Sequence, residues 1–420
     1  MPAACPCGPT AARTTERRSP RVTELADVVG RYGPAFRRTH RLTGDQLKAL
    51  DAIEVCRTAA LGGHTDACPH CGYTRQSYNS CRNRHCPKCQ RLTRARWIAA
   101  RKADLLPVPY FHVVFTLPHD LNALVLHNRR TLIGLLFDTA ARTLADFGRS
   151  TFGGKLGFTM ILHTWDQKLN AHFHLHALVA GGALAGDDGS TRWVASDAKF
   201  LFPVHALSKT FRGKFLAGLK ALRDAGDLTL PAAMSSPATG KPLAALIETL
   251  YRKAWTVYAK PPFDGPQRTL EYLGRYTHRV AISNNRILSI DKEAVRFTYR
   301  DRRDGDRVKV MALPADEFLR RFCLHVLPTG LMRIRHFGFL ANRRKAVLLA
   351  QCRRSLGAPA PDPPPERTTD QWMLVLTGRD IAACPRCGHR PLVRTELPSA
   401  RPPLRLLRRA PPTLHDRLPQ

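Results

Sequence analysis

Residues 170–182 read NAHFHLHALVAGG, and this stretch decides how the rest of the chain is interpreted. Its histidines alternate with other residues and lead into an apolar run that ends in two glycines, a pattern typical of a buried strand. In a strand, residues two apart point to the same face and lie about 6.5–7 Å apart along the chain. We therefore expect Phe173 and Leu175 to pack on one face. The other face is expected to carry the three histidines, His172, His174 and His176.

Three imidazoles on one face favour a metal or phosphate site. A buried, unpaired imidazole costs free energy, and a cation shared by two imidazoles removes that cost. The competing interpretation, hydrogen-bonded strand histidines or a solvated edge, suits one histidine better than three. His163 and Gln167 shortly precede the strand, and a hairpin would bring them close enough to supply a third ligand. The register of such a hairpin is not fixed by the sequence, so the third ligand stays open.

The charge of the chain points to a polyanionic partner. Its 420 residues include 66 Lys and Arg against 33 Asp and Glu, a net charge of +33. Nucleic acid is the default partner for such a balance, and an anionic membrane surface is the competitor. No uncharged apolar run reaches the roughly 20 residues of a membrane span, and the N-terminus lacks the apolar core of a signal peptide. We expect a cytoplasmic, nucleoid-associated protein that binds DNA, with no membrane partner and no small-molecule substrate.

Cysteine spacing predicts structural zinc. Many of the twelve cysteines form C-x-x-C pairs, which in a reducing compartment indicate metal binding rather than disulfides. Each pair can present two thiolates from a tight turn, and two pairs complete a tetrahedral Zn²⁺ site. The site is predicted from the two pairs of residues 56–90, namely Cys68, Cys71, Cys86 and Cys89. Four more possible ligands lie in this segment, although alternative ligation or packing explains them more simply than a second zinc: Cys56, His64, Cys81 and His85.

Basic residues crowd the same segment and suggest phosphate contacts. The expected DNA-binding residues there are Arg82, Arg84 and Lys88, with a solvated basic face as the alternative. Near the C-terminus, Cys384 and Cys387 look like half of a zinc ribbon without its second half. This half can bind a metal only if further ligands come from elsewhere.

The composition divides the chain into four parts. Residues 1–43 are expected to form a basic, largely disordered leader that ends in a short helix near 22–32. Residues 44–100 form the zinc-binding module, and residues 105–345 form the main body. Residues 346–420 form a tail rich in Pro and Arg.

The hydrophobic pattern predicts a mixture of strands and helices. The expected strands cover 110–116, 156–165, 170–182, 280–283, 286–290, 295–300 and 308–313. The expected helices cover 44–57, 91–106, 121–147, 206–224, 244–260, 272–279 and 315–325. Trp255 and Tyr258 are expected in the core.

Tyr272 and Tyr276 are four residues apart, so a helix would place them on one face. Taken alone, such a pair packs more often than it reacts, but Arg275 and Arg279 beside it could hold phosphate. Together with a metal site and a strongly basic chain, the pair suggests phosphoryl transfer on DNA. A tyrosine hydroxyl would attack a backbone phosphorus while the cation polarises the non-bridging oxygens.

Three motifs, in this order along the chain, resemble the IS91-type insertion-sequence transposases, in the two-tyrosine branch of the HUH endonuclease superfamily. They read SYNSCRNRHCPKCQ, HFHLHALVAGG and YLGRYTHRVAI, and the resemblance runs from about residue 56 to residue 344. It implies an α+β fold with a zinc-binding module followed by a catalytic domain, in which helices flank a central antiparallel sheet. It also implies rolling-circle-like transposition, with single-stranded DNA cut through a 5′-phosphotyrosine and assisted by Mg²⁺ or Mn²⁺.

The resemblance assigns roles to residues that match the motifs. His174 and His176 correspond to the paired metal ligands, and Tyr272 and Tyr276 to the nucleophiles. Phe173 stands where relatives often have Pro, which leaves the role of His172 open. Ligand chemistry alone favours a softer metal such as Zn²⁺ for an all-histidine site, so Mg²⁺ or Mn²⁺ rests on the resemblance.

Three alternative functions fit part of this pattern. A rolling-circle replication initiator would share the active site and differ in the DNA it recognises. A non-catalytic, zinc-dependent DNA-binding regulator would use the histidines structurally. A metallophosphoesterase would use an activated water in place of tyrosine.

Overall fold

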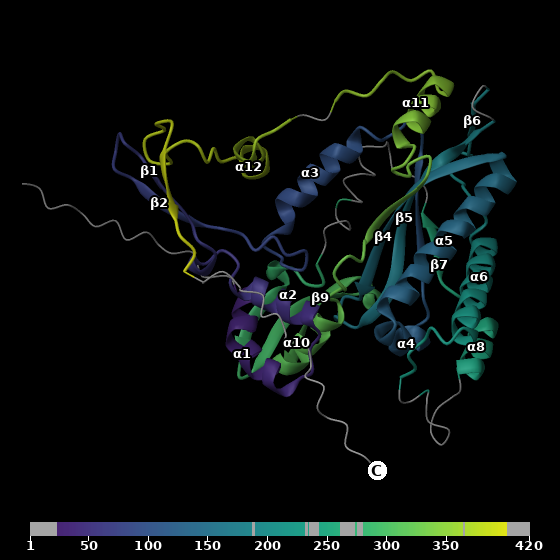
Figure 1. Ribbon diagram of the computed structural model, residues 1–420, viewed down its shortest axis with the longest axis horizontal. Helices are drawn as coiled ribbons and strands as arrows, with labels where there is room; N and C mark the ends of the chain where they lie inside the picture. Colours follow the sequence, from purple (N-terminus) through teal and green to yellow (C-terminus); the bar gives the residue numbers. More distant parts are fainter. Residues whose placement is uncertain are drawn as a thin grey trace, which may run out of the picture.

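The computed structural model of the protein (Figure 1) describes residues 23–186, 190–231, 234, 243–260, 274, 280–363 and 366–400. Helices and antiparallel sheets form an α+β fold, as the sequence analysis expected. In this part of the chain, no helix combines the length and the apolar character needed to cross a membrane.

A six-stranded antiparallel sheet forms the centre of the fold, and the histidine strand is one of its inner strands. The strand order is β11-β4-β5-β3-β7, and the short β6 pairs with the far end of β5. The bounds of these strands are β3 Tyr110–Thr116, β4 Gly154–Trp165, β5 Ala171–Ala185, β6 Arg192–Ala195, β7 Val257–Lys260 and β11 Ile334–Gly338. Because β4 and β3 flank β5 on its two sides, residues of three strands surround the histidines.

Helices cover one face of this sheet and bury its apolar side chains. The covering helices are α4 Asn122–His127, α5 Arg129–Phe152, α6 Val204–Asp224 and α8 Leu243–Arg252, which lie together in Figure 1. Phe173 and Leu175 of β5 point into this core and are almost fully buried. Phe115 of β3 meets Phe211 of α6 edge to face, with ring centroids 5.0 Å apart. The alternation of β5 therefore sends its apolar residues to the helices and its histidines to the opposite face.

The opposite face is covered only in part, by α3 Gln90–Lys102 and α11 Lys345–Ser355. Ile161 of β4 and Leu178 of β5 belong to the apolar cluster at this end, with Leu348 of α11 inside it and Trp97 of α3 packed against it. Two residues further along β4 from Ile161, the same face carries His163. This face is thus apolar beneath the two helices and changes to histidines beyond them.

A second, smaller body joins the N-terminal helices to a three-stranded sheet. It contains α1 Leu25–Thr39, α2 Gly44–Glu54, α10 Ala315–Leu324 and the strands β8 Ile287–Asp291, β9 Ala294–Asp301 and β10 Arg307–Pro314. Val28, Leu50, Phe297 and Phe318 share one buried cluster, which also includes Leu169 from the turn between β4 and β5. The small body is therefore fastened to the turn that leads into the histidine strand.

A third sheet combines the two ends of the chain. It has the order β12-β1-β2, with bounds β1 Gly63–Ala67, β2 Thr74–Tyr78 and β12 Val393–Leu397. In Figure 1 the yellow C-terminal strand runs beside β1 and β2, and α12 Thr369–Thr377 lies near α3. The predicted tail of residues 346–420 therefore contains structured segments that return to the zinc-binding module.

The strand predictions agree well with the structure, with one exception. Strands occur at all the expected places except 280–283, where the chain bends and buries Val280, Ala281 and Ile282 without pairing. The expected helix over 244–260 is wrong in its second half, because the chain ends α8 at Arg252 and re-enters the sheet as β7. As a result, Trp255 is buried while Tyr258 is 48% exposed.

The leader also differs from the expectation. Its helix α1 runs to Thr39, longer than expected, and buries Val28 and Phe36 against α2 and α10. These residues of the leader are thus part of a packed core.

Phe173→Ala should lower the free energy of unfolding by about 3–5 kcal/mol, because it leaves a cavity between β5 and the helices. Phe200→Ala, a matched control at a position that is 55% exposed, should change it by less than about 1 kcal/mol. Denaturant unfolding measures both. Equal effects of the two substitutions would contradict the assignment of Phe173 to the core.

Candidate metal centre

Three histidines from two neighbouring strands come together on the open face of the central sheet. In the antiparallel pairing of β4 with β5, His163 lies directly opposite His174, and His176 follows two residues later on the same face. One ring nitrogen from each of these histidines lies within 4.8 Å of the others. This spacing suits three nitrogen ligands around one cation.

In His174 and His176, hydrogen bonds determine which ring nitrogen is left to bind a metal. Nδ1 of His174 lies 3.0 Å from the carbonyl oxygen of His172, and because a carbonyl only accepts, this nitrogen is protonated. Nδ1 of His176 lies 2.8 Å from Nε2 of His112 on β3. In both residues a metal would therefore be bound through Nε2, since outer hydrogen bonds of this kind orient ligating imidazoles.

His174 and His176 are held neutral, which is the form that binds metals. Burial lowers the pKa of His174 and of His176 well below 6.5, and the nearby His163 lowers both further. His163 and His176 are only 4% and 8% exposed. Near pH 7 the imidazoles of His174 and His176 thus present lone pairs rather than positive charge.

The aromatic rings of Trp165 and His325 pack beside His163. The indole of Trp165 stacks on His163 with ring centroids 4.8 Å apart, and His325 meets the same indole at 6.0 Å. His325 is itself fixed, with Nε2 3.0 Å from the carbonyl oxygen of Leu169 and Nδ1 3.2 Å from the Thr164 hydroxyl. The imidazole of His163 is therefore positioned by packing as well as by its strand.

Two of the predicted ligands lie outside this group. The ring of His172 stacks on that of His119, at 5.0 Å, and meets that of His174 at a tilt, at 4.6 Å. Gln167 belongs to the turn between the strands, where its carbonyl oxygen accepts a hydrogen bond of 2.5 Å from Arg286. A register irregularity between His163 and Trp165 separates this turn from the regular ladder. Of the two candidates for a third ligand, the structure brings His163 to the pair, while Gln167 lies in the turn between β4 and β5.

His112 is a residue of this centre that the sequence analysis missed. It lies on β3 opposite Leu178 and reaches His176 from the neighbouring strand. Its own strand carries no periodic histidine pattern, so only the strand order and register bring it to the centre. Burial, followed by the charge of Lys260, lowers its pKa to about 4.

The predicted nucleophiles and the two arginines beside them lie outside the described residues: Tyr272, Tyr276, Arg275 and Arg279. Gly274, between the two tyrosines in sequence, is described and buried. A Cβ added to it would lie 2.3 Å from Cδ1 of Ile98 on α3. Since Trp97 of the same helix packs against the apolar cluster on the histidine-bearing face, Gly274 lies on that side of the sheet.

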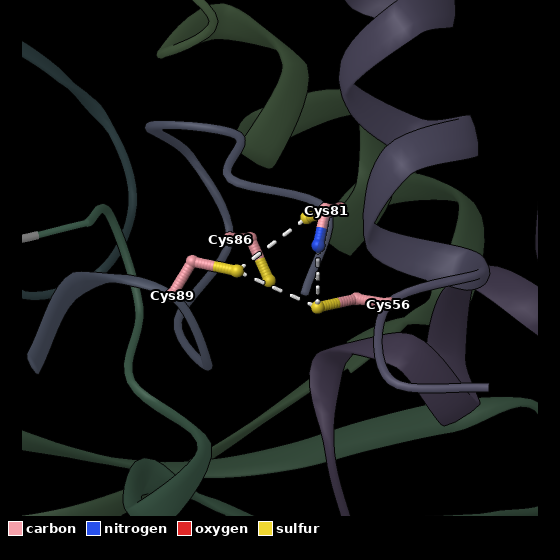
Figure 2. Close-up of side chains that lie close together, drawn as sticks. All are labelled: Cys56, Cys81, Cys86 and Cys89. Carbon is pink, nitrogen blue, oxygen red and sulfur yellow. Dashed lines mark hydrogen bonds between the residues drawn. The ribbon is translucent and has the colours of Figure 1, made fainter. Parts of the chain in front are cut away.

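Four cysteines form a first candidate zinc site, shown in Figure 2: Cys56, Cys81, Cys86 and Cys89. Sγ of Cys89 lies 3.5 Å from that of Cys56 and 3.6 Å from that of Cys81. Four sulfurs on a tetrahedral zinc lie about 3.8 Å apart, so these spacings fit a structural Zn²⁺. Hydrogen bonds from Cys81 and then Cys86 lower the pKa of Cys56 to about 7, which favours the thiolate that zinc requires. The buried sulfurs Cys56 and Cys86 are part of the core of the small body.

This arrangement corrects the predicted zinc site, because Cys68 and Cys71 do not join Cys86 and Cys89. They lie at the turn of the β1–β2 hairpin, whereas Cys56 and Cys81 flank its base, where Asn79 and Gly62 are hydrogen-bonded. Five residues of strand separate turn and base, a distance of about 16 Å. The hairpin is therefore too long for one ion to be shared. Cys68 and Cys71 instead lie beside Cys384 and Cys387.

His64 and His85, the two histidines considered as possible zinc ligands in this segment, belong to neither group of cysteines. Nε2 of His64 lies 3.6 Å from the carboxylate of Asp66. Nε2 of His85 accepts a hydrogen bond of 3.3 Å from the backbone N–H of Leu327. Burial lowers the pKa of His85 to about 3, so it stays neutral inside the fold.

The three basic residues predicted to contact DNA have different surroundings. Arg82 is exposed, with a left-handed backbone at φ 54°. The guanidinium of Arg84 instead donates to the carbonyl oxygens of Leu327, Pro328 and Leu331 at 2.8–3.0 Å. Lys88 forms an ion pair with Glu24. Arg84 thus holds the zinc-binding segment to the loop after α10, and Lys88 holds it to the start of α1. Arg82 is the member of this set that is exposed.

Comparisons with known proteins match two family models to the chain. A family model described as "Transposase zinc-binding domain" matches residues 28–117, and one described as "Putative transposase" matches residues 157–347. The "Putative transposase y4qJ" of Sinorhizobium fredii is 46% identical over 381 residues, which cover 89% of this chain and 95% of that protein. The "Transposase for insertion sequence element IS801" of Pseudomonas savastanoi pv. phaseolicola is 28% identical over 354 residues, which cover 82% of each.

Two histidines outside the group of possible metal ligands, His325 and His336, should make stability depend on pH. Burial lowers the pKa of His325 and of His336 to about 4, below the ordinary 6.5. The unfolded chain therefore binds more protons between pH 6.5 and about 4, so the free energy of unfolding should fall as the pH is lowered through this window. Denaturant unfolding at several pH values measures this slope.

The variant His325→Gln keeps a side-chain donor and removes one titrating group, so its slope should be shallower than that of the wild type. Because zinc loss at low pH affects both proteins alike, the difference between the two slopes isolates His325. Identical slopes would show that His325 does not titrate with folding.

Proposed function

This chain belongs to the IS91-type transposases with an N-terminal zinc-binding domain, and on that basis we propose that it nicks and joins single-stranded DNA through a tyrosine–phosphate intermediate. The observation that carries the proposal is the group of three buried histidines on the open face of the sheet. The relatives are described only as transposases. The proposed chemistry therefore rests on the residues of this site.

The donor set of the centre fits a divalent cation of the first transition series. Nitrogen ligands suit Mn²⁺ better than Mg²⁺, which prefers oxygen. His163, His174 and His176 would hold the ion, and two of these imidazoles are kept neutral by burial. When bound, such an ion polarises the non-bridging oxygens of a phosphate and holds it in place.

The protein's own residues supply the remaining parts of the reaction. We assign the nucleophilic hydroxyls to Tyr272 and Tyr276. The attacking oxygen forms a bond to the phosphorus, and the bond from phosphorus to the 3′ oxygen breaks. The hydroxyl proton passes to that 3′ oxygen, which leaves as a free 3′ hydroxyl while the 5′ phosphate stays on the tyrosine. The reverse attack by a 3′ hydroxyl joins strands without an external energy source.

The position of Gly274 supports this assignment. Gly274 lies between the two tyrosines in sequence and packs against Ile98 of α3, on the same side of the sheet as the histidines. Two tyrosine hydroxyls suit the exchange of two strands, since each attack occupies one tyrosine. The presence of two tyrosines is the basis for proposing a rolling-circle-like transposition.

The charge of the chain supports a DNA partner. A net charge of +33 favours binding to the phosphate backbone regardless of sequence. Within the zinc-binding segment, we assign a phosphate contact to the exposed Arg82, and further contacts to Arg275 and Arg279 beside the tyrosines. We propose single-stranded element ends as the substrate.

Replacing both tyrosines should abolish a covalent protein–DNA product. Purified protein with Mn²⁺ and labelled single-stranded DNA from the end of its element should give a slow, protease-sensitive band on a denaturing gel. The double variant Tyr272→Phe/Tyr276→Phe should reduce this product by about a thousandfold or more. The matched control Tyr258→Phe, at an exposed position on β7, should retain it.

Cleavage that persists in the double variant would instead indicate hydrolysis by a metal-bound water, as in a phosphoesterase. DNA binding without any cleavage by the wild-type protein would favour a regulator.

Substitutions in the histidine centre should weaken metal binding in a graded way. A ligand that binds the folded state raises the melting temperature, so Mn²⁺ titration of the zinc-loaded protein measures its affinity. His174→Ala should lose the Mn²⁺-dependent rise in melting temperature. His112→Ala, which removes the hydrogen-bond partner of His176, should weaken Mn²⁺ affinity by about 10–100-fold.

The control is His127→Ala on α4, an exposed histidine that should leave the titration unchanged. An unchanged Mn²⁺ response in His174→Ala would contradict the assignment of the centre, whatever the DNA assay gives.

A further inference from the structure

Four cysteines from opposite ends of the chain form a second group of possible ligands: Cys68, Cys71, Cys384 and Cys387. Sγ of Cys68 lies 3.6 Å from Sγ of Cys387, and Sγ of Cys71 lies 3.6 Å from Sγ of Cys384. These distances are far from the 2.05 Å of a disulfide and close to the roughly 3.8 Å between sulfurs on a tetrahedral zinc. All four thiols are free, so the group has the composition and the spacing of a closed structural site.

The two cysteine pairs are local copies of one another. Residues 68–72 read CPHCG and residues 384–388 read CPRCG. In each copy the first cysteine's N–H donates to the carbonyl oxygen five residues later, Tyr73 at 2.8 Å and His389 at 3.0 Å.

The glycine that ends each copy makes the same contact in both. Its N–H donates back to the carbonyl oxygen of the first cysteine, at 3.0 Å for Gly72 and 2.9 Å for Gly388. Both glycines have a left-handed backbone, with φ of 70° and 75°. Two tight turns of this kind, each presenting two sulfurs to a common point, form the metal-binding half-sites of a zinc ribbon.

Backbone pairing and a buried carboxylate hold the two turns together. β12 pairs with β1 along its whole length, from Gly63 opposite Leu397 to Ala67 opposite Val393. Asp66 of β1 is 1% exposed and accepts hydrogen bonds of 2.8 Å from both Arg75 of β2 and Arg394 of β12. The guanidinium of Arg75 also donates to the carbonyl oxygen of Ile381, just before the second pair.

The sheet β12-β1-β2 buries few apolar side chains that could stabilise it. Four of the five residues of β12 are exposed, and exposed residues alternate with half-buried ones along β2. A sheet with so small a core normally needs a metal or disulfides to stay folded. The first cysteine site, by contrast, lies against the large cluster of the small body.

We propose that Cys68, Cys71, Cys384 and Cys387 bind a second Zn²⁺, which closes a zinc ribbon built from the two ends of the chain. This site goes beyond the transposase assignment and does not depend on it, since the matched family regions end at residues 117 and 347, before the second pair. The bound zinc anchors the C-terminal segment, so that α12 is held on α3. There Arg96 donates to the Thr369 hydroxyl at 3.0 Å, and Arg91 donates to the carbonyl oxygen of Leu376.

The zinc content of the full-length protein tests the proposal. The variants are made on a His174→Ala background, so that the histidine centre does not add a zinc ion to the count. Native mass spectrometry of the protein with wild-type cysteines should then find two zinc ions per chain, and the double variant Cys384→Ser/Cys387→Ser should hold one. The matched control Cys352→Ala removes a buried cysteine of α11 that belongs to neither group, and it should keep two. The one zinc that the double variant retains shows that its first site is still folded. A single zinc in the protein with wild-type cysteines, or a double variant that keeps both, would overturn the proposal.

A second experiment leaves all cysteines in place and so does not depend on how the variants fold. A specific protease site inserted at the exposed Pro361, between α11 and α12, allows the folded full chain to be cut. The C-terminal piece should stay bound to the rest of the protein and should be released when zinc is removed by a chelator. Release immediately after cutting with zinc present, or retention after zinc removal, would overturn the proposal.

Discussion

The pairing of β4 with β5 is the constraint on which the candidate centre depends. It sets His163 opposite His174, and the two-residue period of β5 then adds His176 on the same face. A slip of one residue would turn the histidines into the core and Phe173 out of it, which the buried apolar face forbids. The hydrophobic packing against α5 and α6 thus fixes the position of the histidines, although none of these helical side chains needs to touch them.

The same pairing explains why part of the site could be predicted from the sequence and part could not. The strand, its two faces and the histidine pair follow from a local alternation that needs no partner. His112 is different, because it reaches His176 only through the pairing of β3 with β5, and a single histidine among apolar residues carries no pattern. The helix expected over 244–260 was wrong for a related reason. Residues Val257–Lys260 pair with β3 as the edge strand β7. This pairing outweighs the helical spacing of their sequence.

The cysteines show the limit of motif spacing most clearly. The sequence predicted each C-x-x-C turn correctly. Turns of this kind are locally alike, however, and their own residues do not determine which other cysteine pair completes the site. The length of the β1–β2 hairpin decides this, because it keeps the turn at Cys68 about 16 Å from the base. At the base, Cys56 and Cys81 come together although 24 residues separate them in sequence. The cysteines that lie beside Cys68 and Cys71 are Cys384 and Cys387, near the other end of the chain. No short motif predicts that contact.

Joining the ends in this way has an energetic consequence. Cys71 and Cys384 are 313 positions apart, and closing a flexible loop of that length costs on the order of 5 kcal/mol. The strands of the ribbon bury too little apolar surface to offset such a cost, and one buried aspartate with two arginines adds only a modest gain. A structural zinc in a four-cysteine site binds with roughly 10–16 kcal/mol, which exceeds the cost of closure. The ribbon would therefore form after the central sheet and the small body have shortened the distance between its halves, and its stability would follow the supply of zinc.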